Sequence, residues 1–147
     1  MRVLVDTNVF LDFLLKRSPH CDDVRGFFSY FLGKGHQIVV SPMSFRDIEY
    51  VLRKVEPDSA KRKHILRTIY SSVYKVLDLS PDDVINDLFE DYKVFEDGLL
   101  IESAKRRMLD GIVTSNVHDF AGCGLPVYRP KELTDILQSK EQPSSAR

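Results

Sequence analysis

The chain has 147 residues, the size of one domain with a substantial hydrophobic core. Its 43% hydrophobic and 29% charged residues are typical of a globular protein, and no apolar stretch approaches the roughly 18 to 20 residues that a membrane span needs. With 21 lysines and arginines against 22 aspartates and glutamates, the net charge of −1 provides no general attraction to nucleic acid.

The N-terminus and the cysteines indicate a cytoplasmic protein without a membrane partner. The first residues lack the basic region and apolar core of a secretory signal, and their apolar side chains belong to a predicted strand. Cys21 and Cys123 are far apart and suggest neither a disulfide framework nor a thiolate metal cluster. We therefore expect one cytoplasmic domain over residues 1–137.

Short apolar runs alternate with longer amphipathic segments along the whole chain. In chain order, the predicted elements are a strand that starts at residue 2 or 3 and ends at Asp6, helices over 9–15 and from Ser18-Pro19 to Gly33, a strand over 37–41, helices over 42–54 and from Pro57, a strand over 74–79, helices from Ser80-Pro81 and over 96–109, strands over 111–114 and 126–128, and a helix over 130–137. The tail, residues 138–147, is polar and is predicted to be disordered. This alternation favours an α/β fold: a three-layer α/β/α sandwich around a central, mostly parallel sheet.

Acidic residues recur where the predicted strands end. Asp6 ends the first strand, Asp47 lies on the helix after the second, Asp97 lies in the first turn of the helix over 96–109, and Asp119 follows the turn Thr114-Ser115-Asn116. Ligands of an open parallel sheet sit outside the carboxyl ends of its strands. We therefore expect distant segments to bring these four acids to one edge of the sheet.

A cluster of this kind predicts a metal site. Two unit charges at ~5 Å repel by about 3 kcal/mol even at an effective dielectric of 20, so protons or a cation must neutralise the group. Oxygen ligands without cysteine or histidine suit Mg²⁺ or Mn²⁺, and such an ion activates water for phosphodiester hydrolysis. The alternative is chance, because the chain has 22 acids, and Asp97 and Asp119 also suit an ordinary helix start and an ordinary turn.

The same segments resemble the PIN-domain ribonucleases. The similar segments are VLVDTNV (3–9), SPMSFRDIEYVL (41–52), FEDGL (95–99) with Glu102-Ser103-Ala104, GIVTSNVHDF (111–120) and PVYRPKEL (126–133). The resemblance covers about residues 2–137 in the right order and extends to the VapC-type toxins of toxin–antitoxin pairs. It implies a Mg²⁺-dependent (or Mn²⁺-dependent) endoribonuclease that leaves a 5′ phosphate, is silenced by a small antitoxin protein and commonly dimerises.

Carried over to this chain, the resemblance implies a set of site residues. Its acidic ligands are Asp6, Asp47, Asp97 and Asp119, and Thr7, Asn8, Thr114 and Asn116 shape the site, the two asparagines by hydrogen bonds to carboxylates or to a metal-bound water. Two positions depart from the family pattern. Asp47 stands where a glutamate is usual, and Gly98 replaces a small alanine. We choose Asp47 over Glu49, about 200° further around the helix, because the apolar residues then keep their core positions.

Other features keep more than one interpretation. The basic clusters at Arg53-Lys54, at Lys61–His64 with Arg67, and at Lys105–Arg107 suit RNA phosphates or solvated helix faces, and the run from Arg53 to Arg67 also suits a surface that contacts an antitoxin. His118 suits a proton donor or a solvent-facing loop residue. A PIN-fold module that binds RNA or protein without cutting is one rival function. A hydrolase of small phosphate esters is another, although Asn8 stands where an aspartyl-nucleophile enzyme usually has its second aspartate.

Overall fold

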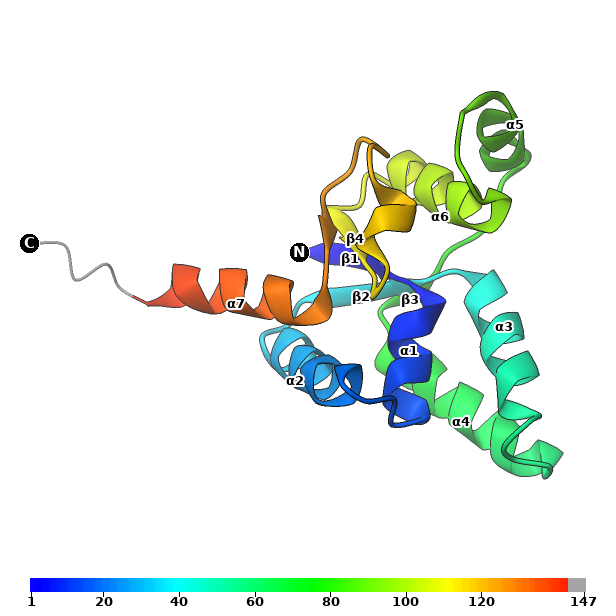
Figure 1. Ribbon diagram of the computed structural model, residues 1–147, viewed down its shortest axis with the longest axis vertical. Coiled ribbons are helices and arrows are strands. Elements are labelled where there is room, and N and C mark those ends of the chain that lie inside the picture. Colours follow the sequence, from blue (N-terminus) through cyan, green and yellow to red (C-terminus); the bar gives the residue numbers. More distant parts are fainter. Residues whose placement is uncertain (143–147) are drawn as a thin grey trace, which may run out of the picture.

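A five-stranded parallel sheet forms the centre of the computed structural model, which describes residues 1–142 (Figure 1). The strands are β1 (Arg2–Val5), β2 (Gln37–Val40), β3 (Lys75–Val76), β4 (Gly111–Val113) and β5 (Val127–Tyr128). Helices cover both faces of the sheet, so the predicted three-layer α/β/α fold is confirmed. Every strand pair is parallel.

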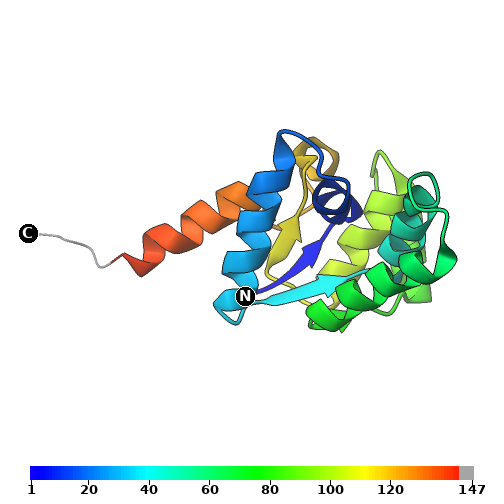
Figure 2. The same cartoon turned by 90° about the horizontal axis from the view of Figure 1, so that it is seen from below.

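The strand order β3-β2-β1-β4-β5 places β1 in the middle. The chain adds β2 and β3 on one side of β1 and then crosses to the other side for β4 and β5. Leu4 of β1 lies opposite Val39 of β2 and Ile112 of β4, and the three strands point toward the same edge in Figure 2. The carboxyl ends of β1 and β4 therefore meet where the strand order reverses, which is the usual binding crevice of an open α/β sheet.

The helices are α1 (Thr7–Leu14), α2 (His20–Gly33), α3 (Pro42–Leu52), α4 (Ser59–Ser72), α5 (Pro81–Phe89), α6 (Phe95–Arg106) and α7 (Pro130–Glu141), with a 3₁₀ helix, η1, at Val117–Phe120. None of them, within residues 1–142, has both the length and the apolar character needed to cross a membrane.

Two hydrophobic clusters pack against the two faces of the sheet. Because side chains alternate along a strand, Val3 and Val5 join the cluster with α1, α2, α3, α4 and α7, whereas Leu4 joins the cluster with α6. In Figure 1, α1, α2 and α4 accordingly lie on one side of the sheet and α5 and α6 on the other.

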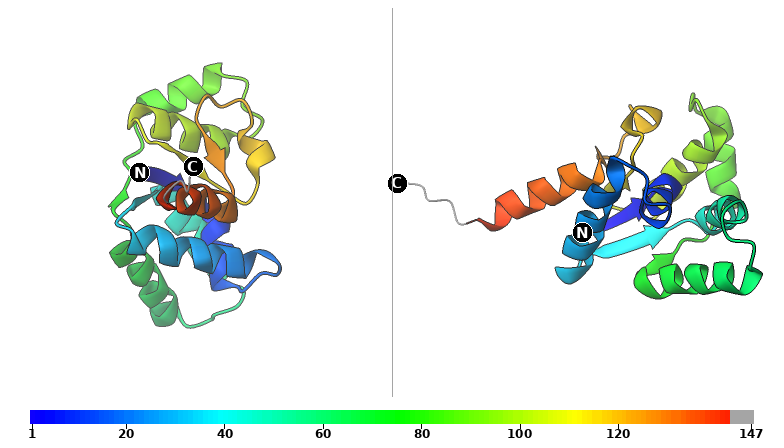
Figure 3. Two further views of the ribbon diagram at one scale, coloured as in Figure 1. Left: turned by 90° about the vertical axis from the view of Figure 1, so that its left-hand side faces the viewer. Right: turned by 60° about the horizontal axis from the view of Figure 1, so that its bottom comes forward.

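Helix α7 corrects the predicted C-terminal boundary. It runs to Glu141, so residues 138–141 of the predicted disordered tail are helical, and residues 143–147 lie outside the described residues. Figure 3 shows α7 projecting from the body of the domain. Its first turns pack on α2, and an ion pair of 3.1 Å joins Glu141 to Lys34 at the end of α2. This tertiary contact supports a last turn that the polar sequence alone does not predict.

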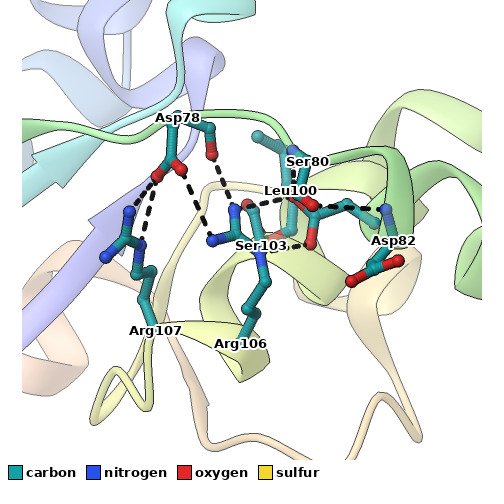
Figure 4. A network of polar contacts seen from close by, with 8 residues as sticks. Asp78, Ser80, Asp82, Leu100, Ser103, Arg106 and Arg107 are labelled. Carbon is teal, nitrogen blue, oxygen red and sulfur yellow. Dashed lines mark hydrogen bonds and ion pairs between the residues drawn. The ribbon is translucent and has the colours of Figure 1, made fainter.

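Polar contacts, rather than apolar packing, hold α5 against α6. The buried carboxylate of Asp83 accepts hydrogen bonds from the Ser80 backbone (2.9 Å) and from Nε and Nη2 of Arg106 (2.8 and 2.9 Å). Arg106 also donates to the carbonyl oxygen of Asp78, and Arg107 pairs with the Asp78 carboxylate (Figure 4). The basic cluster at Lys105–Arg107 is thus largely occupied within the chain.

Because these polar contacts hold the acidic side of α5 against α6, the apolar side of α5 faces solvent. Asp83 and Asp87 are its buried residues, whereas Ile85, Leu88 and Phe89 are exposed, with 87% of Phe89 accessible. The Asp83–Arg106 pair fixes the rotation of the helix about its axis. An apolar face is therefore left on the surface of the described chain.

Candidate active site

Asp6 lies at the carboxyl end of β1 and is buried. It is the residue before α1, but its side chain does not cap that helix. Instead, Oδ2 accepts a hydrogen bond of 2.9 Å from Oγ1 of Thr114, which follows the neighbouring strand β4. Thr114 is fully buried, and its Oγ1 accepts from the Asn116 backbone at 3.0 Å. Adjacent parallel strands thereby hold the Asp6 carboxylate in one orientation.

A cavity of about 250 Å³ opens beside Asp6. Its wall is formed by residues of α1, α3 and α6: Thr7, Asn8, Leu11, Met43, Ser44, Asp47, Val51, Glu96, Asp97 and Leu100, together with Asp6. The Thr7 hydroxyl donates to the Ser44 hydroxyl at 2.8 Å, which ties α1 to α3 at the cavity. Three of the four predicted acids, Asp6, Asp47 and Asp97, thus face one space.

Asp97 has a strongly raised pKa. Burial in the first turn of α6, and then the negative charges of Asp6, Asp119 and Glu96, raise its pKa to about 7. Burial also raises the pKa of Asp6, although hydrogen bonds from Thr114 and the Thr7 backbone partly offset this effect. No basic side chain pairs with Asp6 or Asp97 among the described residues. The ionised site is therefore unfavourable unless protons or a cation neutralise it.

The remaining residues after β4 lie at the exposed side of the site. Asp119 is on η1 and is exposed, and it does not line the cavity, but its charge raises the pKa of both Asp6 and Asp97. Asn116 is exposed and immediately precedes η1. Asn8, by contrast, is a cavity residue on α1. The structure thus brings these residues to the same edge of the sheet without placing all of them in one wall.

Asp47 and Glu49 lie on different sides of α3. Asp47 lines the cavity, and its Oδ1 contacts Nη2 and Nε of Arg46 at 2.7 and 2.9 Å. Glu49 instead pairs with Arg53 (2.7 Å) and with Arg62 of α4 (3.1 Å). Glu49 therefore joins two helices, and Asp47 is the acid of α3 that is available to the site.

Two further acids belong to the neighbourhood but were not predicted. Glu96 lines the cavity next to Asp97. Asp12 is buried on α1, accepts from the Ser115 hydroxyl at 2.7 Å and lies 3.6 Å from Arg17, and its charge contributes to the raised pKa of Asp6. Its position in the apolar run of residues 9–15 is the sequence signal, because an acid there is either paired or functional.

The donor set fits a divalent cation bound partly through water. Within residues 1–142, no three acidic, histidine or cysteine side chains are grouped tightly enough to form a complete protein cage. Mg²⁺ does not need such a cage, because it is usually bound through one or two carboxylates and keeps several waters. The carboxylates at this cavity have the oxygen chemistry for such a site and lack another neutralising partner at Asp6 and Asp97.

Comparison with known families identifies the family of the chain. The sequence profile of the PIN domain matches residues 2–118, which is most of the chain and includes Asp6, Asp47 and Asp97. The chain belongs to the PIN domain family. A comparison with curated proteins finds no match.

Solved structures with the same fold include a toxin–antitoxin complex and two structures that contain bound DNA fragments. A toxin–antitoxin complex from Klebsiella pneumoniae is 21% identical over 88% of this chain and 98% of that chain, with a TM-score of 0.63. VapBC2 from Rickettsia felis, bound to a promoter DNA fragment, is 18% identical over 88% and 98%, with a TM-score of 0.66. FitAB bound to IR36 DNA is 14% identical over 89% and 96%, with a TM-score of 0.67. At these identities, the likeness establishes a shared PIN fold.

Gly98, one of the departures from the family pattern, has a packing role in this PIN domain. A β-carbon built on it would overlap the buried carboxylate of Asp87, whose Cγ would be only 2.5 Å away. The missing side chain therefore lets α5 lie directly against the first turn of α6. Because Asp97 precedes Gly98, this contact also sets the position of a candidate ligand.

We expect Gly98→Ala to destabilise the protein by about 1–3 kcal/mol, because the added methyl overpacks the contact with Asp87. Urea unfolding measures this change. In an Asp87→Ala background the same substitution should cost less, because only the contact of 2.8 Å with the Tyr92 ring remains. The control is Gly26→Ala on α2, where a β-carbon meets nothing within 4 Å and helix propensity should stabilise by about 0.5–1 kcal/mol. Equal costs of Gly98→Ala in both backgrounds would contradict the proposed overlap.

Asp97→Asn should stabilise the metal-free protein at alkaline pH. The folded chain keeps Asp97 protonated up to about pH 7, whereas the ordinary pKa of an aspartate is 3.8, so folding stability falls as the pH rises through this window. The amide cannot ionise, so the variant should exceed the native chain by about 2 kcal/mol at pH 8 and match it near pH 4. Chemical unfolding across pH measures the difference. Asp91→Asn, at an exposed carboxylate, is the control, and a pH-independent effect of Asp97→Asn would refute the assignment.

Proposed function

We propose that this PIN domain is a metal-dependent endoribonuclease and the toxin of a toxin–antitoxin pair. The observation that carries the proposal is the convergence of Asp6, Asp47 and Asp97 on one cavity, from three separate segments, with the charge of Asp119 acting on two of them. An acid cluster without cationic neutralisation at Asp6 and Asp97 is costly to a folded domain. Its chemistry is that of a site for Mg²⁺ or Mn²⁺.

In this proposal, Asp6, Asp47, Asp97 and Asp119 hold the cation. When bound, a divalent ion lowers the pKa of water and stabilises the charge that develops on the phosphate and on the departing 3′ oxygen, so that the product carries a 5′ phosphate. Thr114 orients the Asp6 carboxylate through its hydroxyl. Asn8 and Asn116 offer side-chain amides to carboxylates and waters at the two sides of the site.

The proposed reaction is tested by cleavage of a mixed-sequence, single-stranded RNA in Mg²⁺ or Mn²⁺. Asp6→Asn and Asp97→Asn should each lower the rate of RNA cleavage by more than the ~10–100-fold typical of residues that only support a metal ligand. Thr114→Val should lower the rate by an amount within that range. Asp91→Asn should cleave like the native chain. Calorimetric titration with Mn²⁺ gives an independent readout, because the two acid variants should bind the ion more weakly.

Two outcomes would overturn the proposal. Undiminished cleavage by both Asp6→Asn and Asp97→Asn would remove the site. RNA binding by the native chain without cleavage in either metal would favour the rival function, a PIN-fold binding module.

An antitoxin partner is the second part of the proposal. It is supported by one of the structures with the same fold, the toxin–antitoxin complex from Klebsiella pneumoniae. The protein product of a short reading frame next to the gene should inhibit cleavage in the RNA assay at stoichiometric amounts. We also place this pair in the cytoplasm, where RNA is available and where the two buried, free thiols remain reduced.

We propose that the chain forms a homodimer through the exposed apolar face of α5. The polar side of this helix is used within the chain, so its apolar side, with Ile85, Leu88 and Phe89, is free to pack on the same face of a second copy. Leu88→Asp should convert a dimer to a monomer in light scattering, because a charge would be buried at the two-fold interface. Asp82→Asn, an exposed position on the same helix, should leave the dimer intact. A monomeric native chain at micromolar concentration would contradict this assignment.

A further inference from the structure

Arg46 contacts two acids of the cavity from two different helices. It is on α3, and its Nη2 lies 2.7 Å from Oδ1 of Asp47 and 3.5 Å from Oε1 of Glu96 on α6. Its Nε donates to the same Asp47 oxygen at 2.9 Å. The side chain is 66% exposed, whereas Asp47 and Glu96 line the cavity. The guanidinium group therefore lies at the solvent side of the acidic cavity.

Arg46 is the one basic residue that forms an ion pair with a cavity acid in residues 1–142. The neighbouring arginines of the predicted basic clusters are occupied elsewhere: Arg53 and Arg62 pair with Glu49, and Arg106 pairs with Asp83. A polyanion that approaches the cavity meets carboxylates from α1, α3 and α6 and this single guanidinium. A phosphate that approaches the cavity therefore meets Arg46 as the guanidinium that is already in contact with the cavity acids.

The contacts leave hydrogen-bonding capacity on both partners. Arg46 uses Nε and Nη2, and within residues 1–142 no contact involves Nη1. Both contacts with Asp47 go to Oδ1, so Oδ2 has no basic partner in the described part of the chain. A guanidinium fork matches two oxygens of a phosphate, and its charge persists at every physiological pH.

We propose that Arg46 binds a phosphate of the RNA backbone at the mouth of the cavity, with Asp47 and Glu96 holding the guanidinium in position beforehand. This assignment rests on the proposed nuclease function and adds to it the residue that offsets the repulsion between the acidic site and its substrate. Because two acids from α3 and α6 already orient the side chain, less conformational entropy is lost when the phosphate binds.

The test compares Arg46→Gln with Arg53→Gln. Arg53 is on the same helix, is 63% exposed and pairs with an acid at 2.7 Å, but it does not contact a cavity residue. In RNA cleavage, Arg46→Gln should raise KM about tenfold, as expected for one lost charge-assisted contact, and Arg53→Gln should leave KM unchanged. Arg46→Lys should recover part of this loss, because it keeps the charge without the fork.

RNA binding supplies a readout that does not require cleavage. In an Asp97→Asn background, the slope of log binding constant against log salt should become shallower by about one for Arg46→Gln and remain unchanged for Arg53→Gln. Binding of Mn²⁺ to the Arg46→Gln single variant should not weaken, since the arginine competes with a cation for Asp47 rather than helping to hold it.

The outcomes separate this inference from the proposed function. If the native chain cleaves RNA and Arg46→Gln behaves like Arg53→Gln in KM and in the salt slope, the inference is wrong and the nuclease function stands. A lower kcat with unchanged KM and salt slope also overturns it, because Arg46 would then act only by positioning Asp47. If the native chain does not cleave RNA but Arg46→Gln still makes the salt dependence of RNA binding shallower, the nuclease proposal fails and the phosphate contact is retained.

Discussion

The hydrogen bond from Thr114 to Asp6 across the carboxyl ends of β1 and β4 is the interaction on which the site depends. It exists because the chain returns from β3 to pair β4 with β1, so that two residues separated by more than a hundred positions follow neighbouring parallel strands. The sheet sets the position of Asp6, and the Thr114 hydroxyl sets the orientation of its buried carboxylate. The helices α3 and α6 then complete the cavity around a point that the two central strands have already defined.

The same arrangement opposes stability. Burial, and then the charges of nearby acids, raise the pKa of both Asp6 and Asp97, so ionising the site at neutral pH costs free energy. The domain offsets this cost with two apolar clusters on either face of the sheet and with paired charges outside the cavity, such as Asp83 with Arg106. A site that repels itself but remains folded is typical of a binding or catalytic centre whose ligand carries the opposite charge.

Much of the fold could be predicted because local pattern and tertiary structure agree. Strands such as β2 (Gln37–Val40) are short, mainly apolar runs that end at capping residues, and Ser41-Pro42 and Ser80-Pro81 start helices as their side chains dictate. Disagreements arose where a long-range contact decided the outcome. Helix α7 continues to Glu141 on contact with α2, and α5 exposes its apolar side because Arg106 binds Asp83. The local hydrophobic pattern of each helix does not indicate which distant residue the helix will contact.

The features of the site likewise fall into those that the sequence predicts and those that depend on long-range contacts. The sequence by itself determined which carboxylates follow strands or begin helices, because these places are set by local propensities, and it indicated Asp6, Asp47, Asp97 and Asp119 with their PIN-domain resemblance. Only the tertiary structure decided that Asp12 and Glu96 join the neighbourhood, that Glu49 ties α3 to α4, and that Arg46 rather than a basic cluster stands at the cavity. These outcomes depend on which helices pack side by side, and the electrostatic partner of a charge is chosen by distance in space rather than along the chain.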